Sequence, residues 1–171
     1  MNRIIFNKML CLGVALIVIS CNSKSEKPPY QLDISNEQGI SISYVEMGGV
    51  KTIPVKLNGV TMNMIYDTGC SGIHLSLNEL QTLYKNGKFS ADDILGVEYT
   101  SIADGSIVEN GSINIREIII GDGDNSLVLH NKKATVALNQ VAPILLGNEV
   151  LDELASVEVD NVNRKINFYK K

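Results

Sequence analysis

The sequence is poor in histidine. Its 171 residues include only His74 and His130, which stand far apart along the chain. Zinc sites are built mainly from histidine and cysteine, of which the chain has two and three, and serine–histidine nucleophiles need an imidazole, so the composition argues against both. The acidic stretch "GDGDNS" also fails as a calcium loop, because Lys133 stands eleven residues after Asp122, where an EF-hand needs glutamate. The sequence therefore predicts no metal site and no cofactor.

Basic residues are also in short supply. The chain has 15 lysines and arginines against 19 acidic residues, which gives a net charge of −4. Proteins that bind nucleic acid need a basic face to neutralise phosphates. The charge balance therefore argues against nucleic acid as a partner.

The amino-terminal segment has the features of a secretion signal. Arg3 and Lys8 supply positive charge, and the apolar run from Met9 to Ile19 is too short for a permanent membrane span. The next residues, "VISC", resemble the lipobox of bacterial lipoproteins, in which the signal is cut before a cysteine that then carries lipid. The resemblance implies a signal peptide over residues 1–20 and a lipidated Cys21. It also implies an extracytoplasmic, membrane-anchored location in the bacterial cell envelope. The polar, proline-containing run "NSKSEKPP" predicts a flexible tether, which we extend to residue 35. An ordinary signal peptide and a single anchor helix are the alternatives.

Cysteine is scarce as well, with three residues in the whole chain. Cys11 lies in the segment expected to be removed and Cys21 at the expected lipid site, which leaves Cys70 as the one free thiol of the mature domain. No disulfide can then form within that domain, so its hydrophobic core alone must hold it together. Residues 36–171 are long enough to form one domain with such a core.

Most of this domain has the pattern of β-strands. "KTIPVKLNGVTMNMIYD" predicts a hairpin around Asn58-Gly59, since both turn positions tolerate positive φ. Further turns are predicted at Asp104-Gly105 and Asn110-Gly111, and "SVEVDNVNRKINFYK" predicts a closing hairpin. The fold class expected is therefore all-β and mainly antiparallel.

Two short helices interrupt the strands. Ser76 and Glu79 have the spacing of a capping box, and Gly87 would end the helix that follows. A second short helix is predicted from about Asn148 to Leu154.

The stretch "MIYDTGCSGIHLS" carries the chemistry of the sequence. An apolar strand leads directly into an acidic residue, although burial disfavours a charged carboxylate. The five residues from this acid onward resemble the D-T-G-small-Ser signature of aspartic peptidases: Asp67, Thr68, Gly69, Cys70 and Ser71. A lone D-T-G is weak evidence, because average residue usage gives one by chance in roughly one chain of this length in thirty.

Two further elements strengthen the resemblance. "PILLGNEVLDEL" resembles the apolar-apolar-glycine element and short helix that close retropepsin domains, which implies a ψ-loop at Leu145, Leu146 and Gly147. "YTSIADGSIVENGSI" stands where that family has its flap hairpin, which implies a flap tip at Ala103, Asp104, Gly105 and Ser106. With these elements in this order, residues 50–155 resemble the single-domain retropepsin-like proteins of bacteria. The fold implied is the acid protease barrel.

The resemblance also implies a mechanism. Aspartic peptidases use two carboxylates that share one proton, one accepting a proton from water while the other donates to the peptide carbonyl. Because this chain has one D-T-G, an active form would be a homodimer with Asp67 contributed by each protomer. Thr68 would then hydrogen-bond across the interface, and Gly69 would let the backbone approach the two carboxylates. The predicted activity is endopeptidase cleavage of a protein or peptide substrate.

Alternatives remain for the role of Cys70 and for the function of the whole domain. Cys70 is interpreted as a small packed residue whose thiol is a weak hydrogen-bond donor, with a redox switch as the other interpretation. The whole domain could instead be a non-catalytic binding or dimerisation module of the same fold, or a structural β-domain with a chance D-T-G. The intact Asp67 and the two further elements favour the peptidase.

Overall fold

The computed structural model describes residues 39–171. The predicted signal peptide, the lipidation site at Cys21 and the tether lie outside the described residues. Within the described part, no helix is long and apolar enough to cross a membrane.

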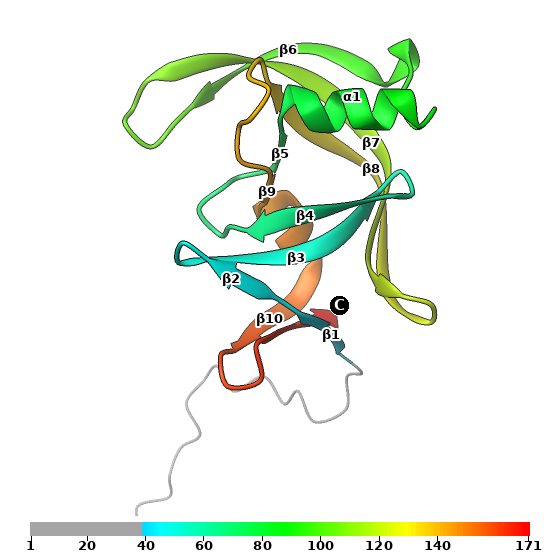
Figure 1. The fold of residues 1–171 in the computed structure, drawn as a ribbon, viewed down its shortest axis with the longest axis vertical. Helices are drawn as coiled ribbons and strands as arrows, with labels where there is room; N and C mark the ends of the chain where they lie inside the picture. Colours follow the sequence, from blue (N-terminus) through cyan, green and yellow to red (C-terminus); the bar gives the residue numbers. More distant parts are fainter. Residues whose placement is uncertain (1–38) are drawn as a thin grey trace, which may run out of the picture. The chain divides into compact units, whose positions relative to one another are not determined.

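The larger of two sheets has eight strands and is mainly antiparallel (Figure 1). Its spatial order is β2 (Val45–Met47), β3 (Val50–Leu57), β4 (Val60–Tyr66), β9 (Leu145–Leu146), β5 (Ile73–Leu75), β8 (Asn125–Ala137), β7 (Ile107–Asp122) and β6 (Ile94–Ser101). Strand β3 pairs with β7 as well, through Lys56 opposite Ile119 and Leu57 opposite Ile118. The strands from β3 to β7 in this order therefore form a closed ring, and the predicted β-barrel is confirmed.

A second sheet joins the two ends of the described domain. Its three antiparallel strands are β1 (Ile40–Ser43), β11 (Lys165–Lys170) and β10 (Leu154–Asp160), with β11 in the middle. Strands β10 and β11 form the closing hairpin that the sequence predicted.

The helices are α1 (Leu77–Lys85), a 3-10 turn η1 (Ala91–Asp93) and α2 (Asn148–Leu151). Helix α1 has the expected capping box, with the Asn78 amide donating to Ser76 Oγ at 3.1 Å and the Ser76 amide to Glu79 Oε2 at 3.1 Å. Helix α2 is shorter than predicted, because Leu154 already belongs to β10 and pairs with Lys170.

Local turn signals were correct at two sites and wrong at a third. Asn58 (φ +48°) and Gly59 (φ +86°) turn the chain between β3 and β4, and Gly105 (φ +83°) lies in the turn between β6 and β7. Asn110 and Gly111, predicted to form a turn, lie inside β7 instead. There they pair with β6 on one side and β8 on the other, and these long-range pairings override the local turn preference.

The core is formed mainly by aliphatic side chains from both sheets and both helices, with the aromatic rings of Phe168 and Tyr44. Burying each large aliphatic side chain contributes about 1.5–3 kcal/mol relative to leaving it exposed. The largest fully buried residues are Phe168, Ile40, Ile53, Leu57, Met64, Ile73, Leu75, Leu83, Ile115, Ile118, Ile120 and Leu146.

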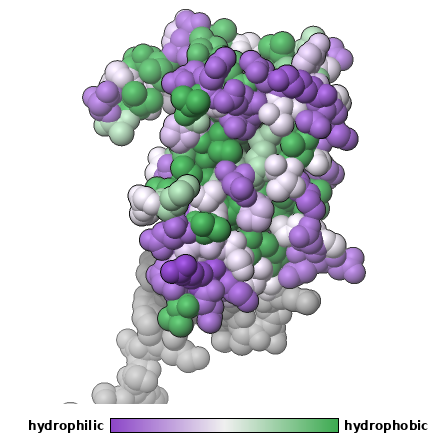
Figure 2. Space-filling model, in the orientation of Figure 1, coloured by the Kyte–Doolittle hydropathy of each residue, from purple (hydrophilic) through white to green (hydrophobic). Residues whose placement is uncertain are grey.

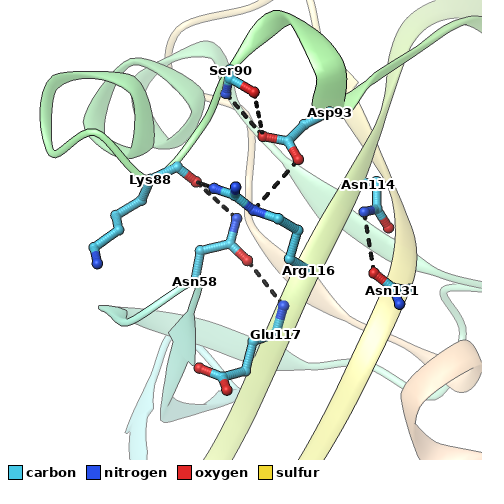
Figure 3. Close-up of polar contacts among 8 residues, drawn as sticks. All are labelled: Asn58, Lys88, Ser90, Asp93, Asn114, Arg116, Glu117 and Asn131. Atoms are coloured by element: carbon cyan, nitrogen blue, oxygen red, sulfur yellow. Dashed lines mark hydrogen bonds and ion pairs between the residues drawn. The ribbon is translucent and has the colours of Figure 1, made fainter.

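A polar network fixes the segment that connects α1 to β6 (Figure 3). The Lys88 carbonyl accepts hydrogen bonds from Asn58 Nδ2 and from Arg116 Nη2, both at 2.9 Å. Asn58 Oδ1 in turn accepts from the Glu117 amide at 3.0 Å. The connecting segment is thereby tied both to the β3–β4 turn and to β7.

Asp93 completes this network from the 3-10 turn. The residue is only about 4% exposed. One carboxylate oxygen lies 3.5 Å from Arg116 Nε, and the other accepts a hydrogen bond from the Ser90 amide at 2.9 Å. Strand β6 begins at the next residue, Ile94. Asp93 therefore ties the start of β6 to Arg116 of β7.

Replacing Asp93 should destabilise the domain. In Asp93→Ala, the Ser90 amide and the Arg116 guanidinium lose a common buried acceptor, which is expected to cost about 1–3 kcal/mol in the free energy of unfolding. Chemical denaturation followed by circular dichroism measures this. The control is Asp92→Ala, an exposed neighbour, which should change stability by less than about 0.5 kcal/mol. Equal stability of the two variants would contradict a structural role for Asp93.

Candidate active site

Asp67 lies at a point where the chain crosses itself. Strand β9 lies between β4 and β5, parallel to the first and antiparallel to the second. Residues 67–72, which connect β4 to β5, must therefore pass over the end of β9; we call them the crossing loop. The Asp67 amide donates to the Leu146 carbonyl at 3.1 Å, which attaches the start of this loop to β9.

The carboxylate of Asp67 is held by the backbone that follows it. The Gly69 amide donates to Asp67 Oδ1 at 2.8 Å. A Cβ added to Gly69 would lie only 3.1 Å from that oxygen, so glycine permits the close approach. Asp67 is half-buried, whereas Thr68 and Gly69 are exposed. The carboxylate thus has one fixed oxygen at the edge of an open surface.

Gly147 lies directly against the crossing loop. A Cβ on Gly147 would overlap the carbonyl oxygens of Cys70 and Gly72 and would lie 2.8 Å from the Cys70 carbonyl carbon. The amides of Asn148 and Glu149, at the start of α2, donate to the carbonyls of Cys70 and Ser71, both at 2.9 Å. A second contact comes from the Asn148 side chain, whose Nδ2 donates to the Thr68 carbonyl at 3.1 Å. The structure therefore brings the two predicted motifs together.

Cys70 does not contact the carboxylate through its thiol. Its Sγ donates to the Gly72 carbonyl at 3.3 Å. Burial raises the pKa of the Cys70 thiol; the Gly72 hydrogen bond lowers it and the negative charge of Asp67 raises it further. Cys70 is therefore a neutral, half-buried thiol at physiological pH, and the thiol donates to Gly72 and not to the Asp67 carboxylate.

Two cavities flank the crossing loop. The first, of about 700 Å³, has Asp67 in its wall, together with the β2–β3 turn, the end of β4 and β10. We call it the Asp67 cavity. The second, of about 600 Å³, lies between residues 70–74, residues 98–101 of β6 and the start of α2. We call it the β5–β6 cavity.

The predicted flap residues are at the tip of the β6–β7 hairpin, which projects from the barrel with apolar and polar side chains mixed on its surface (Figures 1 and 2). The tip is closed by hydrogen bonds from the Gly105 amide to the Ile102 carbonyl at 2.8 Å and from the Ser106 amide to Asp104 Oδ1 at 2.8 Å. Hydrogen bonds from Ser106 also lower the pKa of Asp104. Residues 103–106 at the tip line neither cavity, whereas residues 98–101, the part of β6 that leads into the tip, line the β5–β6 cavity.

Several residues around the site were not found from the sequence. Glu98, Lys133 and Glu149 line the β5–β6 cavity, and Thr135 Oγ1 lies 2.8 Å from His74 Nδ1. No local motif marks them, since they come from separate segments of the chain. Among residues 39–171, no group of three or more histidine, cysteine, aspartate or glutamate side chains could hold a metal ion.

Comparisons with known proteins bear on the fold. No family model matches the chain, and no curated protein matches it. Among solved structures, the chain is similar to the crystal structure of a retropepsin-like aspartic protease from Rickettsia conorii, with a TM-score of 0.54 and 20% sequence identity. The match covers 79% of this chain and 92% of that one. The chain has a retropepsin-like fold.

The close crossing at Gly147 predicts a strong effect of a single methyl group. Gly147→Ala should lower the free energy of unfolding by about 3 kcal/mol, because the new Cβ collides with backbone atoms that cannot rotate away. The control is Gly111→Ala in β7, where the nearest atom to a new Cβ is 3.7 Å away; we expect a change below about 1 kcal/mol. Thermal and urea unfolding of both variants measure the difference. A Gly147→Ala protein as stable as the control would show that the crossing is looser than described.

Proposed function

We propose that the chain is an aspartic endopeptidase whose catalytic pair consists of Asp67 from each of two protomers. The observation that carries this proposal is the Asp67 carboxylate itself. It is fixed through Oδ1 by the Gly69 amide and forms part of the wall of an open cavity in a retropepsin-like fold. The chain contains one D-T-G, so a second copy would supply the other carboxylate.

The proposed chemistry divides the work between two carboxylates that share one proton. The ionised carboxylate accepts a proton from a water molecule, whose oxygen attacks the peptide carbonyl carbon. The protonated one donates to the carbonyl oxygen, and the amine leaves with a proton when the tetrahedral intermediate collapses. Gly69 orients the carboxylate by holding one of its oxygens.

The proposed dimer would use the exposed part of the crossing loop. Thr68 and Gly69 are exposed in the protomer, and the side chain of Thr68 would hydrogen-bond across the interface. An extended peptide would bind between this loop and the β6–β7 hairpin, adding as a strand. A lipid anchor at Cys21, outside the cytoplasm of a bacterial cell, remains part of the proposal; confinement to a membrane would raise the local concentration of protomers.

Asp67→Asn should abolish cleavage. The amide can neither accept the proton from water nor share one with a second carboxylate, so activity should fall at least about 100-fold. The full chain, solubilised in a mild detergent, is incubated with a complex peptide mixture from pH 3.5 to 7.5, and new termini are identified by mass spectrometry.

The control for this experiment is Asp124→Asn, an exposed position in the β7–β8 turn, which should retain full activity. If the native chain produces no new termini at any pH while light scattering shows a dimer, the peptidase proposal is wrong. The binding-module alternative would then be favoured.

The pH dependence should reflect the neighbours of Asp67. Residue 70 gives the carboxylate no hydrogen bond, since the Cys70 thiol donates to the Gly72 carbonyl. In the proposed pair the two carboxylates titrate together, and each hydrogen-bond donor to the charged form moves the activity of such a pair to lower pH. We expect a pH–rate profile that peaks between about pH 4 and pH 7. A peak below about pH 3.5 would contradict this account of Cys70.

A further inference from the structure

The β5–β6 cavity begins three residues after Asp67 and is lined by polar side chains. Cys70 and Ser71 contribute the near wall, Glu98 and the residues after it the wall on β6, and Glu149 the wall on α2. Its volume of about 600 Å³ is sufficient for a long side chain with its hydration. On the proposed function, a peptide held over Asp67 would direct a side chain into this cavity.

The charges in the cavity do not balance. Lys133 is the one cation that lines it, and Lys133 Nζ already forms an ion pair with Glu98 Oε1 at 2.9 Å. Glu149 is half-buried, and within residues 39–171 its carboxylate has no hydrogen bond or ion pair in the structure. The cavity therefore contains one negative charge without a counterion from the described residues.

The backbone fixes the main chain of Glu149 and leaves its carboxylate open. Its own amide donates to the Ser71 carbonyl at 2.9 Å, which fixes the first turn of α2 against the crossing loop. Residue 72 is glycine, and a Cβ there would lie 3.5 Å from Glu149 Oε2. The missing side chain leaves the carboxylate uncovered on that side.

His74 also lines this cavity. Its Nδ1 lies 2.8 Å from Thr135 Oγ1, which is 3.3 Å from the Ile73 carbonyl. The hydroxyl has one proton, so the tautomer of the ring decides which of the two contacts receives it. Burial lowers the pKa of His74, which disfavours a charged imidazolium beside Glu149.

We propose that the β5–β6 cavity selects substrates with an arginine or lysine side chain near the scissile bond, and that Glu149 pairs with this cation. The inference rests on the proposed peptidase function and adds its substrate class. An N–H donor of either side chain forms a charge-assisted hydrogen bond with a carboxylate, which is stronger than a neutral one. An acidic side chain would instead be repelled by Glu149, and an apolar one would remove water from an unpaired carboxylate.

The first test measures cleavage preference. Native chain, Glu149→Gln and the charge-matched control Asp124→Asn, all full-length in detergent, are incubated with peptides from a digest made at acidic residues, which retain internal arginine and lysine. In the products of the native and control proteins, we expect arginine or lysine to be enriched about tenfold at one fixed distance from the cleaved bond. Glu149→Gln should lose this enrichment. Cleavage without enrichment, or enrichment that survives in Glu149→Gln, would overturn the inference while leaving the peptidase proposal intact.

The second test does not depend on catalysis. Fluorescent eight-residue alanine-based peptides carry one arginine at each position in turn, or citrulline, which has nearly the same shape without the charge. Their binding to the full-length Asp67→Asn protein is measured by anisotropy. At one or more positions, we expect the arginine peptide to bind about tenfold more tightly than the citrulline peptide. In the double variant that also carries Glu149→Gln, the two peptides should bind about equally. Equal binding of arginine and citrulline peptides, or no binding of either, would overturn the inference. Circular dichroism checks that Glu149→Gln is folded.

Discussion

The arrangement of the site depends on one backbone crossing. Strand β9 is only two residues long, yet it separates β4 from β5, which are consecutive in the chain. The crossing loop must therefore pass over the end of β9, and Gly147 is the point of contact, where no side chain fits. The same contact aims the first amides of α2 at the carbonyls of the loop. Asp67 thus owes its position to residues far away in the sequence.

Much of the fold could be predicted because local chemistry decides it. Asn58-Gly59 forms the tight turn that this dipeptide favours, and Ser76 with Glu79 caps a helix from within four residues. The turn predicted at Asn110-Gly111 is wrong for the opposite reason. Its backbone is paired on both sides, and Asn110 Nδ2 donates to Thr100 Oγ1 at 3.1 Å, so contacts with distant strands outweigh its turn preference.

The candidate site was predictable only in part. The D-T-G motif and the Leu145–Gly147 element are sequence signals, and the structure brings them into contact. Glu98, Lys133 and Glu149 carry no such signal, because they come from three separate segments and become neighbours only when the barrel closes. The sequence could therefore indicate a chemical class, whereas the electrostatic character of the β5–β6 cavity required the fold.

The crossing loop separates two surfaces of different character. On one side, the Asp67 cavity has apolar walls from Ile65, Leu145 and Val159, all half-buried in the protomer. On the other side, the β5–β6 cavity has a larger share of polar wall and contains the unpaired Glu149. Covering apolar surface with another protein surface lowers the free energy. A polar cavity instead discriminates between ligands by charge and hydrogen bonding. On the proposed function, the apolar side suits a second protomer and the polar side a substrate. Asp67, at the junction, would then meet both.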